Sequence, residues 1–107
     1  MKALLLLALA CLFPLIAGET VSITVTNQSA MRRDVKIIDA YGPLTASFSV
    51  NAGDSQTKSP QKDLVKGGVV QLLNSNLELE QQRSLPDELE SVQVTITGDG
   101  NLVVTTQ

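Results

Sequence analysis

Apolar and polar side chains alternate through much of this chain, and the alternation predicts β-strands. The segments VSITVT (21–26), DVKIID (34–39) and LTASFSV (44–50) place apolar residues at about every second position. Successive side chains of a strand point to opposite faces of a sheet, so each segment should bury one face and expose the other to water. In the third segment we expect every apolar residue, including Leu44, to point inward.

The second half of the chain continues the pattern with polar interruptions. SQTKS (55–59) predicts a polar edge strand that Pro60 ends, because proline cannot donate a ladder hydrogen bond. VVQLLN (69–74) and LELEQQ (77–82) predict a hairpin joined by the two residues between them. Turn residues separate these segments at intervals typical of sandwiches, and none has the length and period of a helix. We therefore predict an all-β antiparallel sandwich of seven or eight short strands.

The closing segment VQVTITGDGNLVVTTQ predicts a hairpin with a definite register. A three-residue loop, Gly98–Gly100, sets Ile96 opposite Leu102 and Val94 opposite Val104, so that both apolar pairs share one face. A two-residue Asp-Gly turn would split that face. The three-residue loop is favoured, with its last glycine in the left-handed conformation.

The N-terminal stretch MKALLLLALACLFPLIAGET predicts a secretory signal peptide. A positive Lys2 precedes an apolar run, and the small residues Ala17 and Gly18 follow it. The run is shorter than the roughly 20 residues needed to span a bilayer, so we expect no stable membrane anchor. We predict a signal peptide over 1–18 and a single domain over 19–107.

The predicted export has a consequence for stability. The chain's one cysteine, Cys11, leaves with the signal peptide, so the mature domain has no disulfide. Small secreted domains usually rely on disulfides, and this one must rely on its apolar core. We expect it in a bacterial periplasm, or secreted.

Charge is unevenly distributed along the predicted domain. Residues 19–66 carry six basic and five acidic residues, whereas residues 67–107 carry one basic and six acidic residues. This is either ordinary solvated charge or a two-signed surface that steers a protein partner. The acidic balance and the scarcity of aromatics exclude a nucleic-acid platform. The candidate partner-binding residues are Arg32, Arg33, Lys36, Lys58 and Lys62.

The residue types present exclude much chemistry. The chain has no histidine and the predicted domain no cysteine, which removes Ser-His-Asp and Cys-His catalysis and the usual zinc ligand sets. Asp99 and Asn101 supply too few oxygen ligands for an EF-hand type of calcium loop. We therefore expect a protein that is not an enzyme, with no catalytic residues, cofactor or metal.

Two segments resemble one known family. GDSQTK (53–58) and the ending PDELESVQVTITGDGNLVVTTQ are similar to stretches of the curli assembly protein C family, small periplasmic proteins encoded with curli fibre genes. The resemblance implies an immunoglobulin-like sandwich that restrains curli subunits from forming amyloid before export. Better-known members carry a Cys-x-Cys pair where this chain has Ala30 and Met31, so any thiol redox role is excluded here.

From this resemblance we expect a periplasmic accessory or chaperone protein for curli-type amyloid fibres. It would be a monomer that binds amyloid fibre subunits and inhibits their premature polymerisation. The Lys58 strand and the Arg32–Lys36 segment would form its partner-facing surface. The alternative is a secreted binding or structural module, such as an adhesin or fibre subunit, which should self-associate.

Overall fold

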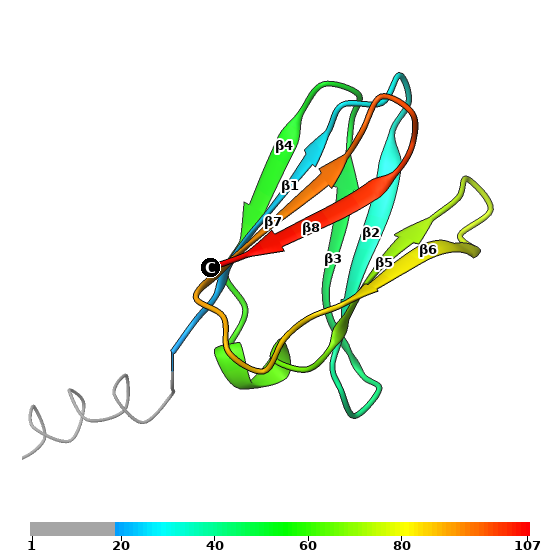
Figure 1. The fold of residues 1–107 in the computed structure, drawn as a ribbon. Helices are drawn as coiled ribbons and strands as arrows, with labels where there is room; N and C mark the ends of the chain where they lie inside the picture. The colour runs from blue at the N-terminus through cyan, green and yellow to red at the C-terminus, as the bar shows by residue number, and fades with distance from the viewer. Residues whose placement is uncertain (1–18) are drawn as a thin grey trace, which may run out of the picture.

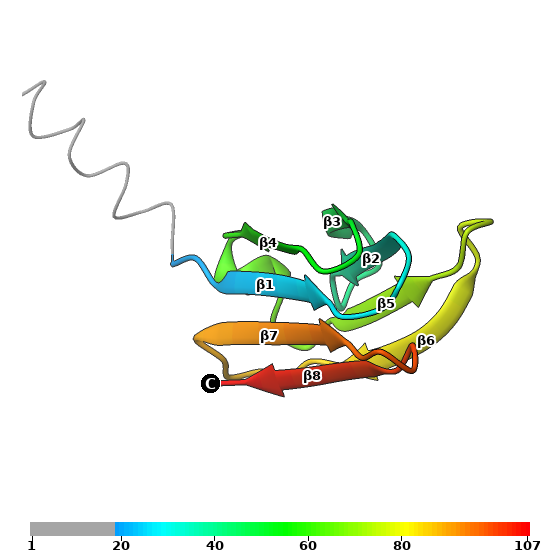
Figure 2. The same cartoon turned by 90° about the horizontal axis from the view of Figure 1, so that it is seen from above.

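Two four-stranded sheets pack face to face in the computed structural model, which describes residues 19–107 (Figures 1 and 2). The predicted all-β sandwich is confirmed, with eight strands. The signal peptide predicted over 1–18 lies outside the described residues. The strands are β1 (Ser22–Asn27), β2 (Arg33–Ile38), β3 (Leu44–Val50), β4 (Ser55–Lys58), β5 (Val69–Leu73), β6 (Leu79–Ser84), β7 (Ser91–Ile96) and β8 (Leu102–Thr106), and a 3-10 turn, η1, covers Lys62–Leu64.

Each sheet combines strands from both halves of the chain. The first sheet has the order β4-β1-β7-β8 and the second the order β3-β2-β5-β6. Figure 2 shows these as two layers. Neighbouring strands are antiparallel except β1 and β7, which run parallel. The sandwich therefore forms only when its N-terminal and C-terminal strands meet.

The core lies between the layers and is almost entirely aliphatic. The inward residues of β1 (Ile23 and Val25) and of β2 (Val35 and Ile37) have no exposed surface. Phe48 of β3 is the largest of the fully buried side chains. This agrees with the predicted alternation, because each strand contributes every second side chain to the interior. Burial of these groups stabilises the domain, whose described residues contain no cysteine.

The prediction for Leu44 is wrong. Phe48 and Val50 are buried and Ala46 packs against the core, but Leu44 is 54% exposed. An irregularity in the β2–β3 register lies between the pairs Ile37–Ala46 and Ile38–Leu44. Because the bulge adds one residue to β3, every side chain on the far side of it changes face.

A buried asparagine holds the loop that joins β1 to β2. The Asn27 side-chain amide donates to the carbonyls of Met31 (2.8 Å) and Val50 (2.9 Å), and its oxygen accepts from the backbone N–H of Ser29 (3.0 Å). Burial of an amide is costly unless its hydrogen bonds are made. Asn27 therefore fixes one end of the sandwich, where β1, β2 and β3 meet.

The closing hairpin has the predicted register. Ile96 pairs with Leu102 and Val94 with Val104. Gly100 has a φ of 83°, in the left-handed region. The three-residue loop between β7 and β8 is confirmed.

The β5–β6 hairpin differs from the prediction. Its loop contains Leu77 as well as the two predicted turn residues, since the Asn74 N–H donates to the Glu78 carbonyl (2.9 Å) and the Leu77 N–H donates to the Asn74 carbonyl (2.9 Å). Leu77 has a φ of 61°, the one positive value at a non-glycine residue in the described chain. The tip of this hairpin projects beyond the rest of the second sheet (Figure 1).

Candidate functional site

The four edge strands are the sites where a sheet can accept another strand. The first sheet ends in β4 and β8, and the second sheet ends in β3 and β6. An edge strand presents unpaired backbone N–H and C=O groups, which invite pairing with another chain unless charge, proline, bulges or covering side chains prevent it. The four edges of this protein are protected to very different degrees.

Side chains from β4 close the β3 edge. Lys58 donates its Nζ to the Ser47 carbonyl, and the Gln56 side-chain oxygen accepts from the Ser49 N–H (3.3 Å). Ser47 and Ser49 alternate with residues whose backbone groups pair with β2, so their own backbone groups point away from β2. The Lys58 Nζ also lies 5.3 Å from the centre of the Phe48 ring. Side chains of β4 therefore occupy two of the backbone groups that an added strand would need.

The β4 edge is short and charged. It spans four residues, Ser55–Lys58, and Pro60 follows. On its outer face, Thr57 and Ser55 form hydroxyl–hydroxyl hydrogen bonds with Thr24 (2.8 Å) and Thr26 (3.0 Å) of β1. Short length, lysine and proline are the devices that natural sheets use to block edge pairing.

The β6 edge carries charge and an irregular register. Arg83 donates from Nη1 to the carbonyl of Gln82 (2.9 Å), and the β5–β6 register shifts between Leu72 and Leu73. Glu80 forms an ion pair with Arg33 at 2.8 Å. These features bend the strand and place charged groups along it, so β6 is also a poor template.

The β8 edge differs from the other three. The Asn101 carbonyl accepts from the Thr97 N–H (2.9 Å) and the Gln107 N–H donates to the Ser91 carbonyl (3.0 Å), so odd-numbered residues of β8 face β7. By alternation, the backbone groups of Leu102, Val104 and Thr106 face away from β7. β8 is the last strand of its sheet, so no strand within residues 19–107 pairs with those groups.

One side chain covers the start of the β8 edge. Gln81 of β6 donates its amide N–H to the Gly100 carbonyl (2.9 Å) and accepts from the Leu102 N–H (2.9 Å). This bidentate contact ties the second sheet to the first at the end where β8 begins. It leaves the edge open from the Leu102 carbonyl to Thr106.

No residue of β8 is charged, and the Arg83 guanidinium lies 3.5 Å from the Gln81 side-chain oxygen at the start of the edge. β8 has the sequence LVVTT, with Leu102 buried, Val103 46% exposed and Val104 half-buried. The outer face of the first sheet is also uncharged, because the residues that the strand register aligns in rows with those of β8 have hydroxyl or amide side chains. These residues are Thr24, Thr26, Ser55, Thr57, Gln93 and Thr95.

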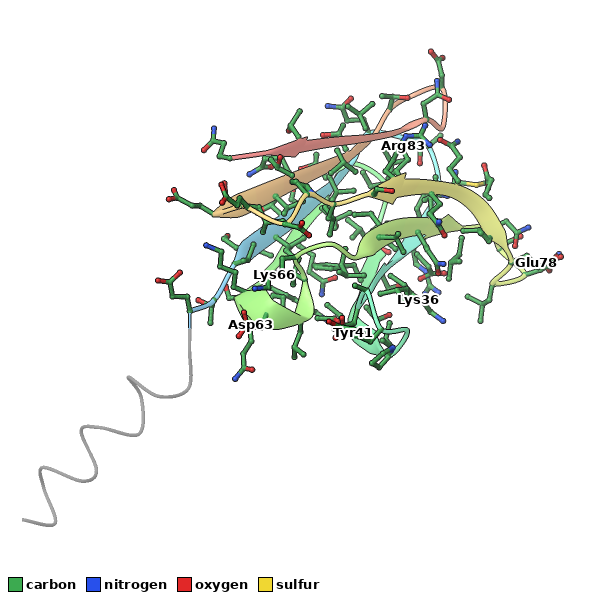
Figure 3. All side chains as sticks on the ribbon, turned by 60° about the horizontal axis from the view of Figure 1, so that its bottom comes forward. Lys36, Tyr41, Asp63, Lys66, Glu78 and Arg83 are labelled. Atoms are coloured by element: carbon green, nitrogen blue, oxygen red, sulfur yellow. The ribbon has the colours of Figure 1, made fainter. Side chains whose placement is uncertain are left out.

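The five basic residues predicted to bind a partner do not form one patch. Lys36 lies on the outer face of the second sheet, on the side away from the first sheet (Figure 3). The Lys58 side chain extends from β4 to the Ser47 carbonyl of β3. Lys62 of η1 forms an ion pair with Glu19 at 3.6 Å. Arg32 is exposed, with Asp34 at 3.9 Å.

Arg33 is the exception, because it is 8% exposed. Its guanidinium pairs with Glu80 (2.8 Å), with the Leu73 carbonyl 3.5 Å away. Arg33 thus joins β2 to the β5–β6 hairpin, and its contacts are internal to the fold.

Two further observations concern other kinds of site. No group of three or more His, Cys, Asp or Glu residues comes together within the described 89 positions, 19–107. No helix in that same range has the length and apolarity to cross a membrane.

Comparison with known proteins identifies the fold alone. No family model matches the chain, and no curated protein matches it significantly. Among solved structures, it is similar to the NMR structure of a protein from Eubacterium rectale, with a TM-score of 0.57 and 17% sequence identity. The match covers 82% of this chain and 88% of that one, so most of the chain is similar to that fold.

Proposed function

We propose that this domain is a periplasmic accessory protein that binds curli-type amyloid subunits and delays their polymerisation. The observation that carries the proposal is the inequality of the edges: three are blocked by side chains, charge or proline, and β8 is open and uncharged. A protein that meets growing β-fibres must bind a strand without offering a second edge for continued growth. One open edge opposite one blocked edge meets that requirement.

The resemblance to the curli assembly protein C family supports the same function. Its GDSQTK stretch forms the turn before β4 and β4 itself, which is the blocked edge of the first sheet. The similar C-terminal stretch ends in β8, which is the open edge. The two segments that carry the resemblance therefore lie at opposite edges of one sheet.

The test is a polymerisation assay with a purified curli-type subunit followed by an amyloid-binding dye. We expect the purified protein to lengthen the lag at substoichiometric ratios, because it acts on growing edges rather than on every subunit. The absence of any delay at any ratio would overturn the proposal.

The assay also tests the predicted basic surface. Lys36→Glu should weaken the delay, and more so at low salt, if Lys36 steers the partner. Lys66→Glu is the matched control, since it makes the same charge change beside Asp63 near η1 (3.4 Å). Equal effects of the two variants would indicate that net charge acts rather than this surface.

A secreted adhesin or fibre subunit is the second candidate function. The open β8 edge favours it too, because an uncharged edge can pair with another copy of the chain. Sedimentation at rising protein concentration separates the two functions. A fibre subunit would assemble, whereas we expect the accessory protein to remain a monomer.

A further inference from the structure

We infer that the β8 edge, from the Leu102 carbonyl to Thr106, binds an extended, uncharged segment of the fibre subunit as a ninth strand. This inference rests on the proposed function and assigns its binding face. In such strand addition, backbone hydrogen bonds supply affinity and alternate side chains supply selectivity. β8 has both the free backbone groups and the distinct faces that this mode requires.

The edge has a defined beginning. Gln81 already occupies the Gly100 carbonyl and the Leu102 N–H, at 2.9 Å each. A docked strand can therefore pair only with the groups that follow, which are the Leu102 carbonyl and both groups of Val104 and Thr106. Gln81 thus limits the register of the docked strand to one short window at the C-terminal end of β8.

The side chains beside this window define the occupant. On the outer face, a docked strand lies next to Val103 and Thr105, in a sheet whose aligned neighbours are hydroxyl and amide side chains. On the inner face it lies next to Val104, which packs against the core. A charged side chain on the inner face would lose its water against the apolar core, which is costly. The matching segment has threonine, serine, glutamine or asparagine outward and an aliphatic residue inward.

A second copy of this chain fits the window less well. An antiparallel pair of β8 strands centred on Val104 sets Leu102 of one copy opposite Thr106 of the other. Gln81 holds the Leu102 N–H in both copies, so two of the expected hydrogen bonds are lost. Pairing would also bring together two chain halves that each carry six acidic residues and one basic residue.

The test is a pair of matched proline substitutions at the two edges of the first sheet. The Thr106 N–H faces away from β7, so Thr106→Pro removes an edge donor without breaking the β7–β8 ladder. The Thr57 backbone N–H also faces away from the neighbouring strand, β1. The Asp54 carbonyl accepts from the Asn27 N–H and the Pro60 carbonyl accepts from the Val21 N–H, so the even-numbered residues of this segment face β1 and the odd-numbered ones face away. Thr57→Pro is therefore the control, and it also removes the hydroxyl contact with Thr24.

In the same polymerisation assay, we expect Thr106→Pro to raise the concentration needed for half-maximal delay about tenfold, the effect of losing one to two net hydrogen bonds. Thr57→Pro should match the wild type. Val103→Lys is a second variant that leaves the backbone intact and places charge beside the edge, and we expect it to lose potency as well. Thermal unfolding of each variant shows whether the fold is retained.

Amide hydrogen exchange gives an independent measurement of occupancy. We expect the Val104 and Thr106 amides of the labelled protein to become protected when unlabelled subunit is added during the lag.

Protection without delay supports the docking site and overturns the proposed function. Delay with unprotected amides and a fully potent Thr106→Pro overturns the docking site and supports the function. Protection that appears without the subunit and rises with protein concentration identifies a second copy as the occupant and overturns the inference. The absence of both protection and delay overturns both proposals.

Discussion

The β7–β8 and β5–β6 hairpins have the same loop but different positions in the sandwich. In the first, the Thr97 N–H donates to the Asn101 carbonyl and the Gly100 N–H donates back to the Thr97 carbonyl, each at 2.9 Å. The second has the same two bonds among Asn74, Leu77 and Glu78. A three-residue loop of this type requires a left-handed residue at its last position. That residue is glycine in one hairpin and leucine in the other.

The strands beyond these loops differ in burial. β7 buries Val92, Val94 and Ile96 completely, whereas β6 has no buried residue. β7 lies inside the first sheet between β1 and β8, and β6 lies at the edge of the second (Figure 1). Local hydrogen bonds therefore determine the shape of a hairpin, whereas its place in the sheet determines how much it stabilises the fold.

The largest difference between the two hairpins should appear when an equivalent leucine is truncated. Leu102, the first residue of β8, is 1% exposed, and Leu79, the first residue of β6, is 55% exposed. We expect Leu102→Ala to lower the free energy of unfolding by about 2–5 kcal/mol, since it leaves a cavity in the core. Leu79→Ala should lower it by about 0.5 kcal/mol. Urea denaturation measures both, and equal losses would contradict the packing described here.

An intermediate effect should follow loss of the contact that joins the hairpins. Gln81→Ala removes two hydrogen bonds between β6 and the start of β8, and we expect a loss of about 1–2 kcal/mol. Gln82→Ala is the matched control, because Gln82 is exposed and its side chain accepts one hydrogen bond from Gln71 (3.1 Å). Urea denaturation of the two variants measures the contact. If Gln82→Ala costs as much as Gln81→Ala, the bidentate contact does not join the sheets.

The two hairpins also differ in how far the sequence predicts them. The β7–β8 register followed from the two apolar pairs and the glycines of its loop, all within a few residues of one another. The β5–β6 loop could not be predicted, because nothing in the sequence marks Leu77 as left-handed. The exposure of Leu44 was missed for a similar reason, since a bulge has no signal in the hydrophobic pattern.

The candidate site was harder to predict than the fold. The Gln81 contact joins residues about twenty positions apart on different sheets, and periodicity does not describe such pairs. For Arg33 a signal was present: it is in phase with Val35 and Ile37, which point into the core. Alternation thus predicts the direction of a charged side chain as well as that of an apolar one.

The smallest expected effect concerns the loop residues themselves. A left-handed conformation costs a non-glycine residue about 1–2 kcal/mol. Glycine avoids this cost, but it loses more conformational entropy on folding, so the net gain is smaller. We therefore expect Leu77→Gly to raise the free energy of unfolding by about 0.5–1 kcal/mol. Gly100→Ala should lower it by a similar amount.

The two substitutions form a sensitive test because they should have opposite signs in loops with the same hydrogen bonds. At Gly100 an added Cβ would lie 3.8 Å from the Arg33 Nη1, which is an ordinary contact, so the expected loss comes from φ and not from a clash. At Leu77 the side chain is 63% exposed, so its removal forfeits little packing. Denaturation midpoints that move in the same direction would show that the two loops differ in solution. Midpoints that move apart would show that the left-handed conformation of Leu77 lowers the stability of the fold, whereas that of Gly100 does not.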